Sequence, residues 1–595
     1  MASRTPPSGS SAALRSGVRR SPPPEQLRTR EAVSYHGVVV TGSAEASWAG
    51  MRMLESGGNA VDAAVAAALA LGVAEPGSSG IGGATYMLIR MADGRAVAID
   101  GSVRAPLRVS LQALAELRET TNLTLPGFSL YGWKTVATPG TLAALDLALR
   151  RFGTRTFSEA VAPAIAIAER GNRWTPAQHS YLEHYVFTLR ESAYLSRLLL
   201  EDAVEVWPEQ HAYCNPDVAC FLRRLSGAGV ETFYRGEIAD EIVADMTTSG
   251  GWLRAADLAF MEATLREPLR GRYRGMEVLS FPHPGGGATV VEALGILDRF
   301  PASLLREHAV DRLHLIVESC RLASADTMPF RRPLRSPDKG AVDPDHLAAR
   351  AALIRFDRAL LPREVNVDPL SRLATGGTTQ VSIADRFGNV VSLTQTLGAT
   401  FGAKVATEGF GFAYNSLVDG FEFSDSRAWT YLQPLQPPIT NMAPTILVAG
   451  GRPRLLLGSA GSNRIPAAIV NAIVAFVDGG LPVGEAVASP RVLWGGPTDQ
   501  VVAVELADPI MEAHADALAR RGFVNQERLE FPATVRDLLE LGAVNAVAID
   551  PRDGRMVGAA DPRRQGTALA ARDGATVEPL ALPGCEQVIS PPPPP

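Results

Sequence analysis

The chain has 595 residues, which is too long for a single compact core of ordinary size. We therefore expect several structural units or one large layered fold. Hydrophobic residues make up 46% and charged residues 20%, values typical of a globular protein. The net charge is −6 and no strongly basic region occurs beyond the N-terminus, which argues against a nucleic-acid partner. The nine histidines form no HExxH pattern, so we expect neither a catalytic metal nor a cofactor.

Both ends of the chain differ in composition from the region between them. Residues 1–34 are rich in Ser, Pro and Arg, which predicts a disordered N-terminal tail, and residues 584–595 predict a Pro-rich tail. The N-terminal region lacks the apolar core of roughly 7–15 residues that a secretory signal needs. No segment offers the ~20 apolar residues of a membrane span. We therefore expect no membrane span, and the sequence leaves the compartment open while favouring the cytoplasm.

The four cysteines form no CxxC pair and lie at Cys214, Cys220, Cys320 and Cys585. This pattern argues against a disulfide framework or a zinc ribbon. A Cys214–Cys220 bridge and two reduced thiols are both compatible with the spacing.

The N-terminal part of the folded region predicts a strand, two helices and a hairpin. The strands are expected at residues 38–41, 85–90 and 96–100, and the helices at residues 46–57 and 59–71. A glycine-rich loop at residues 76–83 precedes the hairpin, and it contains neither of the glycine patterns that cradle nucleotides. Residues 140–360 show mostly helical periodicity, with loops expected at residues 282–287 and 331–339.

The pattern changes after Gly376, where alternating β-rich segments predominate. A turn at residues 386–389 joins two of these segments, and a helix is expected to start near Pro466. The strands are expected at residues 379–385, 390–397, 445–449, 454–457, 544–549 and 556–559. Helices packed on antiparallel strands predict an α+β fold in which helices cover layers of sheet.

The sequence Gly376-Gly377-Thr378-Thr379 stands at the start of the first of these strands. A threonine hydroxyl is a poor nucleophile at neutral pH and needs a base. Cleavage before Thr378 would free its α-amino group, whose pKa of about 7.7–8.0 leaves a useful neutral fraction. Gly377 has no Cβ and can adopt the strained backbone that lets the hydroxyl attack the preceding carbonyl. Taken alone, the four residues are more typical of a turn before an ordinary strand.

The residues that follow this junction resemble a known family. The stretch from Thr378 to Thr396, TTQVSIADRFGNVVSLTQT, resembles the start of the small subunit of γ-glutamyltranspeptidases. GGNAVDAA at residues 57–64, followed by Glu75-Pro76 and SGIGG at residues 79–83, resembles the large-subunit signature of the same family. Shorter similarities follow in the family's order at Thr138-Pro139-Gly140, Pro284-Gly285-Gly286-Gly287, Met442-Ala443-Pro444-Thr445, Gly458-Ser459-Ala460-Gly461-Ser462 and Asp561-Pro562-Arg563. Several long motifs in a fixed order, over roughly residues 36–570, are specific evidence where one alone would be weak.

The resemblance implies a four-layer αββα sandwich of the N-terminal-nucleophile hydrolase type. It also implies a precursor that cleaves itself between Gly377 and Thr378. The products are a large subunit of residues 35–377 and a small catalytic subunit of residues 378–583, which stay together as a heterodimer.

The resemblance also assigns catalytic roles. Thr378 matches the nucleophile, and Thr396 matches the threonine whose hydroxyl orients it. The backbone N–H groups of Gly461 and Ser462 match the oxyanion hole, where one donor lowers the barrier by about 3–4 kcal/mol. A tight turn between a strand and a helix is the alternative interpretation of this last motif, and Thr378 with Thr396 favours the catalytic one.

The substrate pocket departs from the family pattern. Relatives that prefer glutamyl groups use an arginine ahead of an Ala-Pro pair to bind the α-carboxylate, and here Ser102 takes that position. Arg104 lies two residues away and could supply the same clamp, although an exposed ion pair is an equal alternative. Thr440 and Asn441 stand where the family often has two serines, and both can donate to a carboxylate.

Further departures lie near the predicted orienting threonine. Gly398 replaces the family's usual asparagine, and Ser416 and Asp419 stand near Asn415 in place of a glutamine and an aspartate. The predicted substrate-binding residues are Arg104, Thr440, Asn441, Ser416 and Asp419.

Three functions fit these residues. The first is a self-processing γ-glutamyl transferase and glutathione hydrolase, which forms a γ-glutamyl-threonine acyl-enzyme and passes the group to water, an amino acid or a peptide. The second is an acylase of the same scaffold that acts on another amide, such as a cephalosporin side chain or a poly-γ-glutamyl chain. The third is a non-catalytic relative, against which the complete set of catalytic residues argues. Ser102 and Gly398 keep the second hypothesis open.

Overall fold

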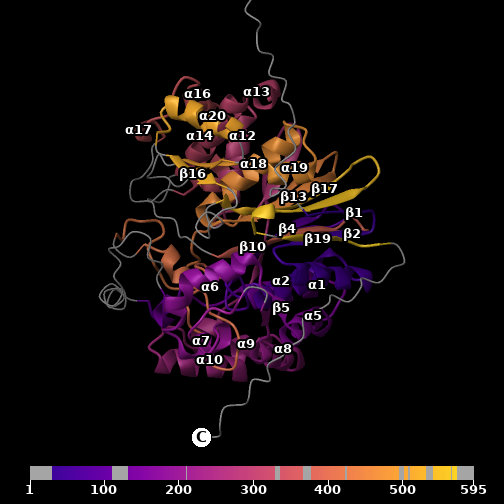
Figure 1. Cartoon of the computed structure of the whole chain (residues 1–595), viewed down its shortest axis with the longest axis vertical. Helices are drawn as coiled ribbons and strands as arrows, with labels where there is room; N and C mark the ends of the chain where they lie inside the picture. The colour runs from indigo at the N-terminus through magenta and orange to yellow at the C-terminus, as the bar shows by residue number, and fades with distance from the viewer. Residues whose placement is uncertain are drawn as a thin grey trace, which may run out of the picture.

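The computed structural model describes residues 30–109, 131–208, 211–328, 336–365, 377–422, 425–494, 502–506, 509–524, 526–530, 541–564 and 566–572. Outside these ranges lie residues 1–29 of the predicted tail at residues 1–34, the predicted tail at residues 584–595, most of the predicted loop at residues 331–339, and Cys585. Two seven-stranded antiparallel sheets dominate the described part, and helices lie on either side of them (Figure 1).

Sheet A joins strands from both ends of the chain. Its order is β1 (Arg30–Ser34), β18 (Met556–Ala560), β17 (Ala543–Ile549), β13 (Arg452–Ala460), β12 (Thr445–Ala449), β9 (Met276–Ser280) and β8 (Leu269–Tyr273). Most of its strands follow residue 440, so residues far apart in sequence complete one hydrogen-bonded ladder.

Sheet B carries the predicted nucleophile on a central strand. Its order is β19 (Thr567–Ala570), β2 (Gly37–Thr41), β10 (Thr378–Asp385), β11 (Val390–Thr396), β3 (Ala84–Arg90), β4 (Ala96–Gly101) and β7 (Thr264–Arg266). The hairpins β10–β11 and β3–β4 confirm the two hairpins that the sequence predicts. Smaller sheets comprise β14 (Val492–Trp494), β15 (Val502–Leu506) and β16 (Gln526–Glu530), and the pair β5 (Asn172–Arg173) and β6 (Ala212–Tyr213).

Strand alternation divides the apolar residues of sheet B between two clusters. Val39 and Val381 face a helical cluster, whereas Val38 and Val40 face sheet A, where they join Leu456 and Val547. The helices of the first cluster include α1 (Ala44–Glu55), α2 (Ala60–Ala74), α4 (Thr141–Phe152), α5 (Phe157–Arg170), α8 (Pro216–Ala228) and α10 (Glu237–Thr248). Sheet B is therefore buried on both faces.

A third apolar cluster covers the other face of sheet A. Its helices include α12 (Gly287–Leu297), α14 (Ala309–Thr327), α16 (Pro344–Leu353), α18 (Ile465–Val477) and α19 (Val483–Ala488). In Figure 1 this group lies above the strands and the group around α1 and α2 lies below them. The predicted α+β class, with helices over antiparallel sheets, is confirmed.

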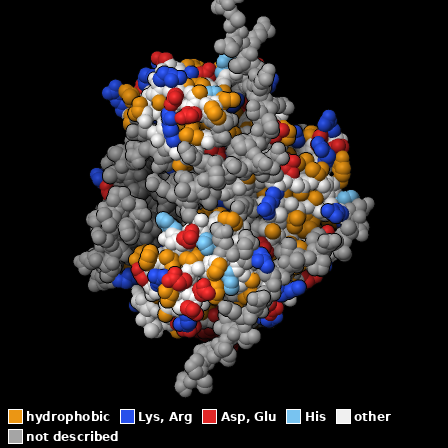
Figure 2. Space-filling view, viewed as in Figure 1, with side chains coloured by type: hydrophobic (Ala, Val, Ile, Leu, Met, Phe, Trp, Pro, Cys, Tyr) orange, Lys and Arg blue, Asp and Glu red, His pale blue; other side chains and the backbone are white. Residues whose placement is uncertain are grey.

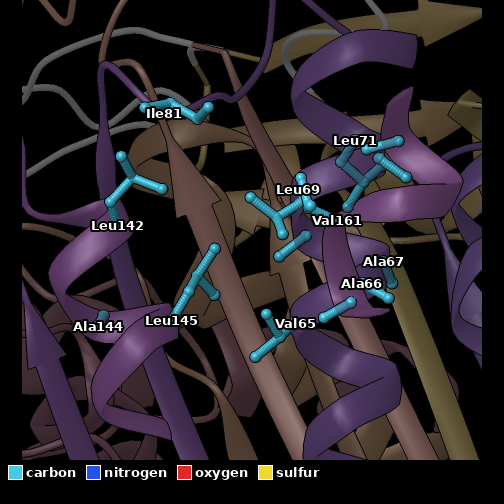
Figure 3. Packing of buried hydrophobic residues seen from close by; sticks show 14 of the residues in the cluster. Val65, Ala66, Ala67, Leu69, Leu71, Ile81, Leu142, Ala144, Leu145 and Val161 are labelled. Atoms are coloured by element: carbon cyan, nitrogen blue, oxygen red, sulfur yellow. The ribbon is translucent and has the colours of Figure 1, made fainter. Parts of the chain in front are cut away.

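The Ala-rich helix α2 lies at the centre of the first helical group, as its composition predicts. Its N-cap is Asn59, whose side chain accepts hydrogen bonds from the backbone N–H groups of Val61 and Asp62. Small alanine side chains let α1 and α5 approach closely, and Figure 3 shows Val161 of α5 beside α2 and Leu145 of α4 nearby. The C-terminal end of α2 delivers Glu75 and the glycine loop to sheet B.

Three sequence-based expectations are wrong. Residues 30–34, predicted as part of a disordered tail, form β1 on the open edge of β18, a backbone partner that composition cannot reveal. Residues 264–280 form β7, β8 and β9 within a region predicted as mostly helical. The sequence did not indicate these strands because their alternation of apolar and polar residues is short and lies between helices. Neither alternative for Cys214 and Cys220 holds, because Cys220 is free whereas Cys214 is disulfide-bonded.

The described helices give no candidate membrane span, since none combines sufficient length with sufficient apolar character. On the face that Figure 2 shows, acidic and basic side chains of the described residues are intermixed rather than separated by sign.

A buried ion cluster anchors the C-terminal segment that approaches Thr378. Arg563 lies 2.6 Å from Glu505 and 3.2 Å from Asp561, and Asp561 also pairs with Arg491 at 2.5 Å. The two carboxylates balance the two guanidinium groups, and the four side chains are almost fully buried. The paired charges keep the pKa of Asp561 below its usual range despite burial.

We expect Glu505→Gln to lower the free energy of unfolding by about 3–5 kcal/mol, because it leaves one buried positive charge without compensation. Chemical denaturation followed by fluorescence would measure the loss. Asp550→Asn is the control, because the Asp550–Arg552 pair has an exposed arginine at the surface and should contribute nothing measurable. Equal stability of the Glu505 variant and the parent would contradict the prediction.

Candidate active site

The predicted nucleophile and its predicted orienting partner face each other across two strands. Thr378 is the first residue of β10 and pairs with Thr396, the last residue of β11. Thr396 in turn pairs with Ala84 of β3, and the next register step places Thr85 opposite Gly101 of β4. The ends of four neighbouring strands therefore form one row, in which the nucleophile occupies one end.

Two hydroxyl groups and the carbonyl group of Gly377 form a continuous hydrogen-bond chain. The Thr378 hydroxyl donates to the Thr396 hydroxyl oxygen at 3.0 Å, and the Thr396 hydroxyl donates to the carbonyl oxygen of Gly377 at 2.5 Å. The Gly398 N–H also donates to the Thr396 hydroxyl at 3.0 Å. Thr396 thus contacts both the Thr378 hydroxyl and the Gly377 carbonyl that this hydroxyl is predicted to attack. Thr378 and Thr396 are both buried, so water competes little with these bonds.

The structure corrects the reason for a glycine at position 377. Gly377 does not lie in the left-handed region of backbone space. A Cβ atom there would instead meet the carbonyl oxygen of Gly77 at 2.6 Å and the Cα of Ser78 at 3.1 Å. Close approach of two backbone segments therefore requires this glycine, and no backbone strain is needed.

The glycine loop at residues 76–83 supports the segment after Thr396. The carbonyl oxygen of Ser78 accepts from the Leu397 N–H, and the carbonyl oxygen of Gly77 accepts from the Phe401 N–H. A Cβ at Gly83 would lie 2.2 Å from the carbonyl oxygen of Thr396. The loop therefore packs against the backbone that positions Thr396.

The predicted oxyanion-hole residues lie at the end of β13, on the sheet that faces β10. Gln380 packs against Gly458, and Ala460 lines the same cavity as Thr378. Gly461 and Ser462 follow directly, with φ angles of 121° and 55°. Both φ angles lie in the left-handed region, so the backbone turns sharply after β13. Their assignment as the oxyanion hole stays a prediction.

Arg104 is engaged within its own segment. Its Nη1 donates to the carbonyl oxygens of Ser102 at 3.4 Å and Val103 at 3.2 Å, and it lies 4.0 Å from Asp100. Asp100 also lies 3.4 Å from Arg266, so two guanidinium groups share one carboxylate. Three strand spacings separate the Ser102 end of the row from Thr378, roughly 14 Å. Arg104 therefore stands at the far end of the row, with its charge partly balanced.

The other predicted substrate residues fall into two groups. Ser416 lies beside the orienting threonine, because its N–H donates to Leu397 O at 2.9 Å and its hydroxyl accepts from Ala399 N–H at 2.9 Å. Asp419 lies in the short helix η3 (Leu417–Gly420), close to Ser416 in the chain. These two positions belong to the segment that faces Gly398.

Thr440 and Asn441 lie against the glycine-rich loop at residues 284–287. The Thr440 N–H donates to the carbonyl oxygen of Pro284 at 2.9 Å, and its hydroxyl accepts from Met442 N–H at 3.2 Å. A Cβ at Gly286 would lie 2.4 Å from the Asn441 carbonyl oxygen. Their role in binding a carboxylate stays a prediction.

Two residues near Thr378 were not assigned a role from the sequence. Arg564 donates to the carbonyl oxygen of Thr378 at 3.1 Å. Glu75 is buried, and the Thr379 hydroxyl donates to it. Burial raises the pKa of Glu75 to about 7, against the opposing effects of Thr379 and the charge of Arg564. A carboxyl group at the end of a buried Ala-rich helix is the signal that could have identified Glu75.

Both residues line a small cavity, the edge cavity, which has about 20 Å³ open to the centre of a water molecule. Its walls come from α2, α6 (Pro176–Leu189), β10, β13, β17 and η5 (Pro562–Arg564). The lining includes Gly42, Glu75, Tyr181, Thr378, Thr379, Asn545, Asp561 and Arg564.

Known proteins are similar to this chain along nearly its whole length. The gamma-glutamyltranspeptidase family matches residues 46–571. The acylase ACY 1 proenzyme of Pseudomonas sp. (strain V22) is 34% identical over 552 residues, which cover 92% of this chain and 95% of that protein. The glutathione hydrolase proenzyme of Escherichia coli (strain K12) is 28% identical over 544 residues, which cover 89% of this chain and 90% of that protein.

The crystal structure of a cephalosporin acylase from Bacillus halodurans is also similar. It aligns with a TM-score of 0.81 and 27% identity, and it covers 93% of this chain and 99% of that one. The family match spans both strand ends that hold the Thr378–Thr396 pair. The chain therefore belongs to the gamma-glutamyltranspeptidase family.

Proposed function

We propose that the chain is a precursor that cleaves itself between Gly377 and Thr378, and that the freed Thr378 is the nucleophile of an amidohydrolase. The proposal includes a four-layer αββα sandwich, made of a large subunit of residues 35–377 and a small subunit beginning at Thr378. The two fragments would remain together as a heterodimer, because β10 pairs with β2 of the large fragment.

One observation carries this proposal. The Thr378 hydroxyl, the Thr396 hydroxyl and the Gly377 carbonyl oxygen form one hydrogen-bond chain. Thr396 donates to the scissile carbonyl and so stabilises the negative charge that grows on its oxygen during attack. After cleavage the α-amino group of Thr378 becomes available as the base for substrate turnover.

N-terminal sequencing of the purified small fragment would test the cleavage site. The expected first residues are Thr-Thr-Gln-Val. A fully active chain that is never cut, or a fragment with a different first residue, would overturn the proposal.

As the substrate we propose a γ-glutamyl amide such as glutathione, with water, an amino acid or a peptide as the acceptor. The family membership supports this class, and the glutathione hydrolase proenzyme of Escherichia coli is among the similar proteins. Arg104, Thr440 and Asn441 would hold the substrate carboxylate, and Ser416 with Asp419 would lie nearer the reacting carbonyl.

An acylase with a different acyl group is the second candidate, favoured by the geometry of Arg104. Its guanidinium lies 4.0 Å from Asp100, so part of its charge is already balanced before a substrate arrives. Proteins named as acylases are also among the similar ones. Matured protein given a panel of γ-glutamyl and other acyl anilides would separate the two candidates, because turnover confined to non-glutamyl anilides supports the acylase.

We expect Arg104→Ala to lower kcat/KM for γ-glutamyl amides by about one to two powers of ten. Charge-assisted hydrogen bonds contribute roughly 1.5–3 kcal/mol each, and the variant loses such bonds to the carboxylate. Self-cleavage should be unchanged, since the Gly377–Thr378 bond presents no such carboxylate. Steady-state kinetics on γ-glutamyl and plain acyl anilides would measure the difference.

Two control variants sharpen this test. Arg108→Ala removes an exposed arginine from the same segment and should leave kcat/KM unchanged. Arg104→Lys keeps the charge but loses the planar fork, so it should fall between the parent and Arg104→Ala. An Arg104→Ala enzyme that handles γ-glutamyl substrates as well as the parent would contradict the glutamyl assignment and favour the acylase.

A further inference from the structure

The edge cavity lies beside the first residues of β10, on the side of that strand where β2 does not reach them. β10 pairs with β11 along most of its length, starting at Thr378, but β2 pairs only with residues 382–385. The chain leaves β2 at Thr41 and turns away at Gly42, which lines the cavity. The first residues of β10 therefore border the cavity rather than a neighbouring strand.

The backbone of Thr378 points into the edge cavity. Arg564 donates to the Thr378 carbonyl oxygen at 3.1 Å, and Asn545 donates to the Gln380 carbonyl oxygen at 2.9 Å, both from the cavity wall. In a β-strand the N–H and C=O groups of one residue point to the same side. The nitrogen of Thr378, which becomes the α-amino group on cleavage, therefore faces the edge cavity as well.

The cavity has polar groups in its wall and is large enough for a water molecule. About 20 Å³ is open to the centre of a water, above the roughly 10–15 Å³ that one needs. The hydroxyl of Tyr181 lines the cavity, is almost fully buried and has no hydrogen-bond partner among the described residues. Buried hydroxyl groups are nearly always satisfied, so a water in the cavity is the expected partner of Tyr181.

Glu75 is the cavity group that can exchange a proton near neutral pH. It is faced by Arg564 and Asp561 from the C-terminal segment, by Tyr181 from α6 and by Glu45 from α1. Burial raises the pKa of Glu75 to about 7, with a smaller contribution in the same direction from the charge of Glu45 and with Thr379 and Arg564 opposing the rise. Near pH 7 the protonated and ionised forms therefore coexist.

We propose that Glu75 delivers a proton, through a water molecule in the edge cavity, to the nitrogen of Thr378 when the precursor cleaves itself. This inference rests on the proposed self-cleavage. A bond forms between Thr378 Oγ1 and the Gly377 carbonyl carbon, and the bond from that carbon to the Thr378 nitrogen breaks. The nitrogen takes a proton from the water, and the water takes one from Glu75.

The proton balance closes over the whole reaction. The Thr378 hydroxyl, which donates to Thr396 rather than into the cavity, gives up one proton to solvent, and Glu75 takes one proton back from solvent, so the carboxyl group ends as it began. A second water then hydrolyses the ester and leaves a carboxyl group on Gly377 and a free Thr378. Glu75 acts through water rather than by contact with the reacting atoms, so it is a positioning residue for the transfer.

The test follows cleavage of the full-length chain made by cell-free synthesis and chased at a series of pH values on both sides of 7. Gel separation of precursor and fragments gives the rate constant. The proton donor is the protonated carboxyl, so the parent rate should fall as the pH rises through about 7. Glu75→Gln should slow cleavage below that pH by roughly 10–100-fold and remove the fall. Glu75→Asp should restore part of the rate together with the pH dependence.

Two further variants keep the inference testable if Glu75→Gln fails to fold, as limited proteolysis would reveal. Tyr181→Phe removes a hydroxyl that holds the water, so it should cleave several-fold more slowly and keep the fall near pH 7. Glu45→Gln removes a neighbouring negative charge and lowers the pKa of Glu75, so it should keep the full rate and move the fall to lower pH.

A parent chain that is never cut would overturn the proposed function. A parent that is cut, beside a folded Glu75→Gln variant with the same rate and the same pH profile, would overturn only the role of Glu75. If Glu75→Gln does not fold, two results together would overturn the role of Glu75. These are a Tyr181→Phe chain that is cut as fast as the parent, and a Glu45→Gln chain whose cleavage rate falls at the same pH as in the parent.

Discussion

Thr378→Ala is expected to leave the precursor uncut and without turnover. The same hydroxyl attacks the Gly377 carbonyl during maturation and the substrate carbonyl afterwards, so one substitution removes both reactions. The 3.0 Å hydrogen bond from Thr378 to Thr396 disappears with it, but the backbone pairing of β10 with β11 does not depend on the side chain. Gel electrophoresis and an anilide assay would show one full-length, inactive band.

Thr378→Ser is the matched control for this prediction. Serine keeps a hydroxyl at the same position, so the precursor should still be cut and should retain measurable turnover. If Thr378→Ala matures and hydrolyses substrate, another residue must be the nucleophile, and the proposed function fails.

Thr396→Val is expected to slow self-cleavage by about 10²–10³-fold without abolishing it. Valine has nearly the same shape as threonine but lacks the hydroxyl that donates to the Gly377 carbonyl and accepts from Thr378. Loss of one such donor to a developing oxyanion costs about 2.7–4 kcal/mol of barrier. The nucleophile itself remains, which is why the loss is smaller than in Thr378→Ala. Time-resolved gels of newly made precursor would give the rate.

Thr396→Ser keeps the hydroxyl and should mature close to the parent rate. A Thr396→Val precursor that is cut as fast as the parent would show that the hydrogen bond to the scissile carbonyl contributes nothing. Complete and permanent loss of cleavage, equal to that of Thr378→Ala, would contradict the ranking of the two threonines.

Several local features could be predicted from the sequence because they depend on neighbouring residues. The alternation at residues 379–385 and 390–397, with a turn between them, predicted the β10–β11 hairpin and hence the pairing of the nucleophile with Thr396. Composition predicted the buried helix at residues 59–71, which the structure confirms as Ala60–Ala74. Motif order gave the family, because long matches in fixed order rarely arise by chance.

Other features depend on contacts between residues far apart in the chain. β1 exists because β18, more than 500 residues later, offers an open edge. The need for glycine at position 377 comes from the approach of Gly77, not from the local backbone. The sequence left Arg104 equally open to a substrate carboxylate and to an ion pair, and only the structure shows that Asp100 lies beside it.

The sequence by itself determined the family and the hairpin that pairs Thr378 with Thr396, since these follow from local pattern and ordered motifs. Only the tertiary structure decided what surrounds that pair. Glu75 from α2 and Arg564 from η5 meet at the open edge of β10 because β2 ends at Thr41 and leaves that edge uncovered. Burial at this meeting point raises the pKa of Glu75, and burial is a property of the assembled layers rather than of any short segment.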